Sequence, residues 1–257
     1  MNLGFIGTGE ITVAMVTGFC TAESCPERVI VSPRNAVNAA ALAAAFPVVE
    51  VAADNQAVVE ASDWLVLAVL PQVAAEALAP LRFRPGQKVV SVIAGLPLAA
   101  AAELVTPAQM LAQALPLPPA ARHLGPVGIC PPNAAVAELF GRIGTSIEVS
   151  DEREFDAFWS VTSLMAPFYG LLHHSATWLT DKGVPSEAAG RYVGAMFHAL
   201  AENACQAGTE GFARLTQDSQ TPGGLNEQTY RALSAAGLYR HEEEALDAVL
   251  ARLRVDQ

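Results

Sequence analysis

Short apolar runs that do not alternate with polar residues recur through the first 150 residues of the chain. They are separated by stretches rich in alanine, the strongest helix former. Continuous apolar strands of this kind are buried on both faces, as in parallel sheets covered by helices on either side. The alternation therefore predicts an α/β fold with a doubly wound parallel sheet. We expect strands over residues 2–7, 28–32, 48–51, 64–69, 88–93, 109–115 and 147–149, and helices over residues 10–20, 35–45, 55–61, 74–81 and 97–105.

The sequence after residue 150 has a different character, with no convincing strand. We expect helices over residues 154–178, 186–207, 211–217 and 226–254, with breaks at residues 183–185 (GVP) and 222–224 (PGG). This predicts two domains, residues 1–150 with the sheet and residues 151–257 with helices alone. Helices so rich in alanine and apolar residues should bury one face against a second copy, so we expect a homodimer or a larger homo-oligomer through the C-terminal helices.

Composition and charge argue against several classes of partner. The net charge of −11 disfavours nucleic acid, whose phosphates require a basic face. The most apolar run, residues 64–70, is far shorter than the roughly 20 residues of a membrane span, and the first residues lack the basic stretch of a signal peptide. The cysteines form no CxxC pair and have no histidine at ligand spacing, so we expect reduced thiols, a cytoplasmic protein and no metal site.

The most specific motif is a glycine-rich turn at residues 4–9 (GFIGTG), after the first expected strand and before the first expected helix. Gly7 suits the tight turn, and Gly9 lets the main chain approach a pyrophosphate closely. A full dinucleotide fingerprint has Gly or Ala at position 12, where this chain has the small residue Thr12. The motif predicts a Rossmann domain whose helix N-terminus holds the phosphates. The expected site is completed by three further residues of this turn, Thr8, Glu10 and Ile11.

The end of the second expected strand indicates which dinucleotide binds. NAD sites usually carry Asp or Glu there, to accept hydrogen bonds from the ribose. Residues 32–34 read SPR instead, so no carboxylate repels a 2′-phosphate. Ser32 can donate a hydrogen bond to that phosphate, and Arg34 can pair with it. We therefore expect NADP, bound as NADPH, as the cofactor.

With these motifs, nearly the whole chain resembles the pyrroline-5-carboxylate reductase family. Residues 4–9 resemble its opening turn, residues 31–34 its 2′-phosphate loop and residues 221–224 (TPGG) its Ser-Pro-Gly-Gly substrate turn. Residues 54–55, 61–63, 67–72 and 91–95 resemble further stretches of its cofactor-binding domain. The resemblance implies a Rossmann domain followed by a helical domain that interleaves with a second subunit. It also implies cofactor contacts at Asn55, Ala68, Val69, Leu70, Pro71, Ala94 and Gly95.

The departures from the family pattern lie mostly in the substrate half. Leu70 stands where the family usually has Lys, and residues 113–117 (QALPL) lack the Arg and Asn of its Arg-x-Met-Pro-Asn segment. Residues 165–169 (MAPFY) stand in place of Ser-Gly-Pro-Ala-Tyr, and Leu225 and Asn226 replace two threonines. This pattern predicts a divergent reductase whose substrate need not be pyrroline-5-carboxylate.

The expected reaction is transfer of a hydride from NADPH to the C=N bond of a small cyclic imine, for example pyrroline-5-carboxylate to proline. A cyclic imine can arrive protonated, so the protein has only to hold it against the nicotinamide. The resemblance implies that main-chain amides of Gly223 and Gly224, in the turn that starts at Thr221, bind the carboxylate of an amino-acid-like substrate. Asn226 is a candidate to hydrogen bond to the ring nitrogen or the carboxylate.

Two other readings stay open. A β-hydroxyacid dehydrogenase needs a lysine on a helix as proton donor, and the two lysines, Lys88 and Lys182, fall before a strand and in a turn. Alternatively, the chain binds NADP without catalysis, having lost its substrate pocket. Tyr169, His173 and His174 are candidate acids, although such helical clusters more often serve packing or subunit contact. Steady-state consumption of NADPH would distinguish an enzyme from a protein that binds NADP without catalysis.

Overall fold

The structure is a computed structural model that describes residues 1–255, without the side chains of residues 209, 210 and 255. It divides into two compact units. The first runs from Met1 to Trp159 and includes the end of the last helix from Arg252, and the second runs from Ser160 to Ala251. The division passes through helix α7 (Glu152–Thr162), just after the boundary predicted at residue 150.

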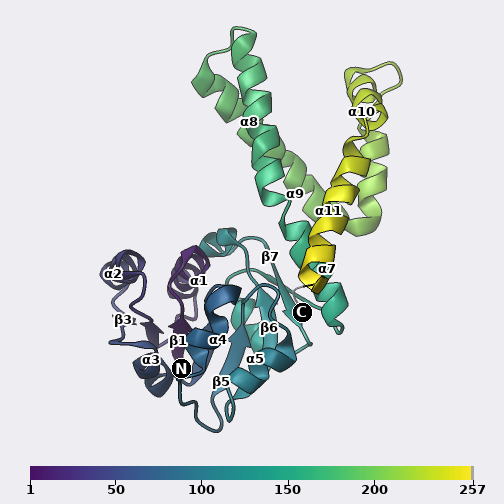
Figure 1. Ribbon diagram of the computed structural model, residues 1–257. Coiled ribbons are helices and arrows are strands. Elements are labelled where there is room, and N and C mark those ends of the chain that lie inside the picture. The colour runs from purple at the N-terminus through teal and green to yellow at the C-terminus, as the bar shows by residue number, and fades with distance from the viewer. Residues whose placement is uncertain (256–257) are drawn as a thin grey trace. The chain divides into compact units, whose positions relative to one another are not determined.

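The first unit contains one sheet of eight strands in the order β3-β2-β1-β4-β5-β6-β7-β8 (Figure 1). Every neighbouring pair is parallel except β6 and β7. The predicted α/β class, with a doubly wound sheet followed by helices, is therefore confirmed. The strands are β1 (Asn2–Ile6), β2 (Arg28–Val31), β3 (Val49–Val51), β4 (Trp64–Leu67), β5 (Lys88–Ser91), β6 (Gln109–Leu115), β7 (Pro126–Cys130) and β8 (Thr145–Glu148).

The sequence analysis missed strand β7 and placed the last strand two residues late. Pro126 and Gly128 disfavour a strand by local preference, although proline is tolerated at the first residue of a strand. Pairing on both edges overrides that preference, because β7 lies between β6 and β8. Val127 and Ile129 are buried there, and a Cβ at Gly128 would lie 3.0 Å from the ring of Phe158. Close packing therefore favours a residue without a side chain in the middle of this strand.

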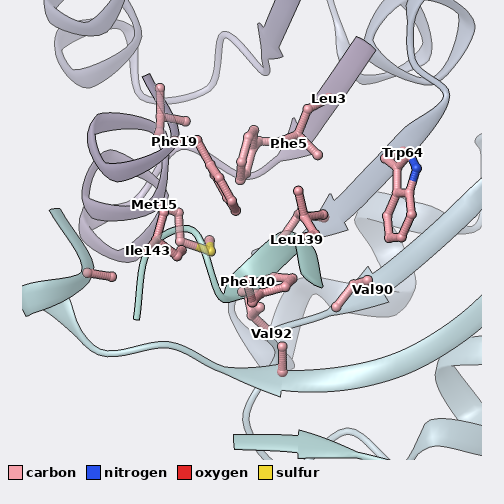
Figure 2. Packing of buried hydrophobic residues seen from close by; sticks show 14 of the residues in the cluster. Leu3, Phe5, Met15, Phe19, Trp64, Val90, Val92, Leu139, Phe140 and Ile143 are labelled. Atoms are coloured by element: carbon pink, nitrogen blue, oxygen red, sulfur yellow. The ribbon is translucent and has the colours of Figure 1, made fainter. Parts of the chain in front are cut away.

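Helices cover both faces of the sheet, and side chains that alternate along each strand fill the two layers. On one face α1, α2 and α6 pack over Phe5 and its neighbours, and on the other α3 and α4 pack over Ile6. Figure 2 shows the first layer, where the ring of Phe19 lies 6.4 Å from that of Phe5 and 5.9 Å from that of Phe140. The elements between the strands are α1 (Glu10–Thr21), α2 (Ala36–Ala45), α3 (Asn55–Ala61), α4 (Ala74–Leu78), α5 (Leu98–Leu104), α6 (Ala134–Phe140) and the 3₁₀ turns η1 (Pro71–Val73) and η2 (Pro118–Arg122).

The second unit is helical throughout its described residues, as predicted. It contains the end of α7, α8 (Met165–Asp181), α9 (Ser186–Asp218), α10 (Leu225–Ala235) and most of α11 (Leu238–Val255). Two predicted helices proved to be interrupted, one between α7 and α8 and the other between α10 and α11. Gly237, with φ of +85°, follows the C-cap Ala236 of α10, a position where glycine commonly ends a helix. Helix α9 continues past its predicted end but bends at Gly208, where φ is +64°.

The second unit leaves most of its large apolar side chains on the surface. Among its described residues, the buried hydrophobic side chains are those of Ala189 and Val193. By contrast, Trp178 is 60% exposed and Tyr192 is 66% exposed. Exposed apolar surface of this extent is unusual for a monomer and typical of an interface. None of the helices in the described part of the chain is both long and apolar enough to span a membrane.

Candidate functional site

The residues predicted to bind a dinucleotide lie where parallel strands of the first unit end. Strands β1 to β5 run in the same direction, so the connections that follow them share one edge of the sheet. The strand order reverses between β1 and β4, which makes their carboxyl ends the switch point where such sheets bind ligands. The predicted residues of these connections are Gly7, Thr8, Gly9, Glu10, Ile11, Ser32, Arg34, Asn55, Ala68, Val69, Leu70, Pro71, Ala94 and Gly95.

The two glycines of the first turn meet different demands. Gly7 has φ of +102°, and a Cβ on it would overlap the main chain of Ala68 at the end of β4. It therefore serves the close approach of two strand ends. Gly9, the residue that precedes α1, has an ordinary φ of −81°, and a Cβ on it would meet no described atom within 4 Å. Gly9 thus leaves open space over the first turn of α1, whose amides have no partner within the helix.

Thr12 supports the same turn, which explains the departure from the usual glycine or alanine. Its side chain is fully buried, and its hydroxyl donates a hydrogen bond of 2.8 Å to the carbonyl of Gly7. A hydroxyl that satisfies a buried carbonyl stabilises the turn and avoids an unpaired polar group. The sequence showed only that Thr12 is small enough to fit; its hydrogen bond came from the tertiary structure.

The side chain of Ser32 lies inside the fold, whereas the sequence analysis expected it to donate a hydrogen bond to a bound 2′-phosphate. Its side chain is fully buried, and its hydroxyl accepts a hydrogen bond of 2.9 Å from the amide of Gly7. The hydroxyl of Thr8 donates a bond of 2.6 Å to the carbonyl of Ser32, and the side-chain amide of Asn38 donates one of 3.1 Å to the carbonyl of Thr8. Its predicted contact with a 2′-phosphate stays a prediction. Ser32 instead fastens the loop after β2 to the turn after β1, with help from Asn38, which the sequence analysis missed.

Arg34 retains the features of an anion-binding residue. Its side chain is exposed and makes no hydrogen bond or ion pair with any described residue. Arg28, at the start of β2, differs because Glu50 accepts two bonds of 2.9 and 2.7 Å from its guanidinium. That pairing lowers the pKa of the Glu50 carboxyl and neutralises Arg28. Of these two arginines, only Arg34 can offer its charge to a phosphate.

Hydrogen bonds to neighbouring residues fix the connections after β4 and β5. The amide of Ala68 donates a 2.8 Å hydrogen bond to the carbonyl of Ile6, and Leu70, two residues later, is 70% exposed. After β5, Gly95 has φ of +69°. The side-chain amide of Gln113 donates to the carbonyl of Leu96, so the residue that stands in place of an arginine now anchors this loop. Glu152 also holds it, by accepting a 3.2 Å bond from the amide of Leu98.

The predicted substrate residues lie in the second unit, at the start of α10. Gly223 has φ of +73°, and its amide donates a 2.6 Å bond to Oε2 of Glu227. The amide of Gly224 donates a 2.8 Å bond to the carbonyl of Thr221. Both amides that were expected to bind a carboxylate thus have partners within the chain, and binding of a substrate carboxylate at this turn stays a prediction.

The side chains beside this turn are also engaged. Asn226 donates a 3.0 Å bond from its side-chain amide to the carbonyl of Ser219. Glu227 was missed by the sequence analysis, although its position three residues after the N-cap Gly224 is the capping-box spacing. The turn is therefore closed by hydrogen bonds of its own, while the first amides of α10 have no partner within the helix.

The other candidates show no arrangement that favours acid–base chemistry. Tyr169, His173 and His174 are exposed on α8, with the two histidine rings 5.7 Å apart. The ammonium of Lys88 lies 5.0 Å from the ring of Trp64, and that of Lys182 lies 5.6 Å from the ring of Trp178. Within residues 1–255 no three His, Cys, Asp or Glu side chains are grouped as a metal would require.

A hollow in the surface of the first unit lies beside the predicted site. It has a volume of about 540 Å³ and lies between α3 and α4. It includes Asn55 but none of the residues of the glycine turn. Asp54, Glu60 and Glu76 give its lining three carboxylates, which disfavour a phosphate group.

Similar proteins support the resemblance over the whole chain. Residues 2–95 match a family described as NADP oxidoreductase, coenzyme F420-dependent. A pyrroline-5-carboxylate reductase from Pseudomonas aeruginosa is 27% identical over 263 residues, which cover 98% of this chain and 95% of that protein. The predicted resemblance to the pyrroline-5-carboxylate reductase family is thereby confirmed.

Three solved structures share the fold. Pyrroline-5-carboxylate reductase from Streptococcus pyogenes has a TM-score of 0.83 at 22% identity, covering 99% of this chain and 98% of that one. Pyrroline carboxylate reductase from Plasmodium falciparum, with NADP bound, has a TM-score of 0.85 at 17% identity, covering 100% and 98%. A reductive aminase from Aspergillus terreus, in complex with NADPH, cyclohexanone and allyl amine, has a TM-score of 0.59 at 19% identity, covering 98% and 92%.

Proposed function

Because this chain is similar to pyrroline-5-carboxylate reductases along its whole length, we propose that it is an NADP-dependent oxidoreductase that reduces the C=N bond of a small cyclic imine. The observation that carries the proposal is the glycine turn at the switch point between β1 and β4, with the unpaired Arg34 after the neighbouring strand. The matched family supports an NADP oxidoreductase as the general class. The cyclic imine is the finer part of the proposal.

In this proposal the first unit binds NADPH across the ends of its strands. The pyrophosphate lies over Gly9, where amides of Glu10 and Ile11 in the first turn of α1 and the helix dipole favour negative charge. Arg34 pairs with the 2′-phosphate. Thr8 and Ser32 hold the two loops in register rather than touching the phosphate themselves. The remaining contacts are at Asn55, Ala68, Val69, Leu70, Pro71, Ala94 and Gly95.

The fit of these residues to a dinucleotide rests on their chemistry. The open space over Gly9 suits a group that approaches the main chain closely, and no described carboxylate pairs with Arg34. When bound, NADPH supplies the hydride. The chain's own task is to orient an imine that arrives protonated, which requires no strong acid. A site without a buried acid is compatible with that task.

We also propose that the second unit pairs with a second copy of the chain. The apolar side chains that it exposes include Trp178, Tyr192 and Leu200. Covering one such side chain contributes about 1.5–3 kcal/mol, so several together can hold a dimer. The oligomer is checked by light scattering over a range of concentrations; a monomer at all of them would refute this part. The four free thiols suit a cytoplasmic protein.

The proposed reaction is tested by following NADPH consumption with cyclic imines, ketones and hydroxyacids. We expect turnover with at least one imine, and NADPH in preference to NADH. Oxidation of a 3-hydroxyacid with NADP would instead favour the β-hydroxyacid dehydrogenase reading. Against that reading, Lys88 starts a strand and Lys182 follows the end of α8, so neither lies within a helix.

A second candidate is a protein that binds NADP without catalysis. The observation that favours it is the pairing of the Gly223 and Gly224 amides within the chain. Tight binding of NADPH together with no turnover across the whole panel would select this candidate. Absence of binding to either dinucleotide would refute both.

A further inference from the structure

Two cysteines of the first unit lie side by side where α1 ends. Cys20 is the last residue but one of that helix, and Cys25 lies in the connection of residues 22–27 that leads to β2. The thiol of Cys25 donates a 3.3 Å hydrogen bond to the carbonyl of Pro26, and its sulfur accepts a hydrogen bond from the thiol of Cys20. The two sulfur atoms are therefore neighbours within one unit of the structure.

Residues distant in sequence hold both ends of this connection in place. At the last turn of α1, Nε2 of His123 lies 3.0 Å from the hydroxyl of Thr21 and 3.0 Å from the carbonyl of Gly18. Within the connection, the guanidinium of Arg142 donates a 3.1 Å hydrogen bond to the carbonyl of Ser24. Because the main chain is fixed on both sides, the two thiols stay together, and a bond between them requires little reorganisation.

The two thiols differ in accessibility and in ease of ionisation. Cys25 is exposed, whereas Cys20 is partly buried. Burial and, to a smaller extent, the neighbouring Cys25 raise the pKa of the Cys20 thiol to about 12. The thiolate is the nucleophile in thiol–disulfide exchange, so Cys25 is the thiol that reacts first with a disulfide from solution. Once Cys25 is modified, it carries no negative charge that opposes ionisation of Cys20.

We propose that Cys20 and Cys25 form a redox-active dithiol site that reacts with small disulfides of the glutathione type. The Cys25 thiolate attacks one sulfur of glutathione disulfide, which forms a mixed disulfide and releases one glutathione thiolate. Cys20 then loses its proton to solvent and attacks the Cys25 sulfur, which forms the Cys20–Cys25 disulfide and releases the second glutathione thiolate. Two protein thiols are oxidised, one glutathione disulfide is reduced, and the two protons pass through the solvent to the two glutathione thiolates.

The bridge closes the loop of residues 20–25 at the end of α1 that is remote from the glycine turn. Cys20 lies about 16 Å from Gly9 along the helix axis, at a rise of about 1.5 Å per residue. The bridge therefore protects Cys25 from a lasting adduct without reaching the residues proposed to hold the pyrophosphate. It also restricts the unfolded chain, which should raise the urea concentration needed for unfolding.

The test treats the full-length protein with glutathione disulfide at about pH 8 and identifies the products by mass spectrometry. Trypsin releases both thiols in one peptide, residues 1–28, and cleavage after Glu23 then separates them unless a disulfide joins the two halves. We expect joined halves that carry no glutathione. A glutathione adduct that persists on Cys25, a bridge from Cys25 to any other thiol, or an unmodified Cys25 would overturn the proposal.

Variants without the second thiol show whether Cys20 is responsible. In Cys20→Ser and in Cys20→Ala, the glutathione adduct on Cys25 should be about tenfold or more abundant than in the unaltered protein, because no neighbouring thiol displaces it. Cys205→Ser is the matched control, since it removes an exposed thiol of the second unit, and it should leave the Cys20–Cys25 bridge unchanged. Equal amounts of the adduct with and without Cys20 would overturn the proposal.

The stability of the oxidised protein gives a second measurement. With Cys205→Ser in place, the oxidised form should unfold at a higher urea concentration than the reduced form. A lower midpoint would mean that the folded chain does not accommodate the bridge, and it would also overturn the proposal. Neither measurement uses NADPH or an imine, so the outcome is independent of the proposed function.

Discussion

Alanine in place of Gly7 should damage the fold, because that glycine serves a close approach between strands. Its φ of +102° is unfavourable for alanine by about 1–2 kcal/mol. The new Cβ would also lie 2.6 Å from the carbonyl carbon of Ala68. Ala68 cannot move away easily, since its amide is bonded to Ile6 at 2.8 Å. With part of the Gly7–Ser32 hydrogen bond lost as well, the free energy of unfolding should fall by about 3–4 kcal/mol.

Alanine in place of Gly9 should leave the fold nearly intact and damage cofactor binding. Its φ of −81° is ordinary, and no described atom lies within 4 Å of the added Cβ. The expected loss of stability is that of a poorer N-cap, about 0.5–1 kcal/mol. The methyl group would project into the space proposed for the pyrophosphate. Affinity for NADPH should therefore fall by about tenfold or more, which is about 1.4 kcal/mol.

The assay measures unfolding in urea by circular dichroism and NADPH binding by calorimetry for both variants. Gly86→Ala is a control, because Gly86 has φ of +83° but no described atom within 4 Å of an added Cβ. Gly86→Ala should lower the free energy of unfolding by about 1–2 kcal/mol. The additional loss of stability in Gly7→Ala then measures the effect of the overlap with Ala68. NADPH binding by Gly9→Ala that matches the unaltered protein would refute the phosphate site, and equal losses of stability in Gly7→Ala and Gly86→Ala would refute the close approach.

Three further outcomes follow from single side chains. Arg34→Ala should weaken NADPH binding by about 1.5–3 kcal/mol with little effect on NADH; equal losses for both in calorimetry would remove Arg34 from the 2′-phosphate site. Ser32→Ala should lower the free energy of unfolding by about 1–3 kcal/mol, because the Gly7 amide loses its hydrogen-bond partner. Unchanged stability in urea would contradict a stabilising role for the Ser32–Gly7 hydrogen bond. Burial raises the pKa of the Cys20 thiol to about 12 and that of Cys130 to about 11, so at about pH 8 iodoacetamide should modify the exposed Cys25 and Cys205 first. Mass spectrometry of the alkylated peptides checks the order, and early labelling of Cys130 would contradict it.

The parts of the fold that were predicted correctly depend on short-range patterns. The continuous apolar run of β4 and the turn from β1 into α1 are each encoded within about a dozen residues by hydrophobicity and backbone preference. Strand β7 was missed because its proline and glycine oppose a strand locally. Its neighbours β6 and β8 supply the hydrogen bonds and the burial that make residues 126–130 a strand.

Some residues of the candidate site could likewise be predicted from the sequence, whereas others could not. Arg34 and Gly9 could be proposed from the sequence, since their proposed roles need only a charge and an absent side chain at known places in a strand–turn–helix unit. The role of Ser32 could not, because its partner Gly7 is 25 residues away. The carboxylate of Glu227 lay at a recognisable spacing, yet only its position against Gly223 showed that the turn is occupied.

By itself, the sequence determined the α/β class and the position of the glycine turn between β1 and α1, because local backbone rules and the period of apolar residues act without knowledge of the rest of the chain. Only the tertiary structure decided which hydroxyls and amides remain available to a ligand. A polar group is satisfied by whichever partner folding brings within hydrogen-bond distance, and several of those partners are remote in sequence.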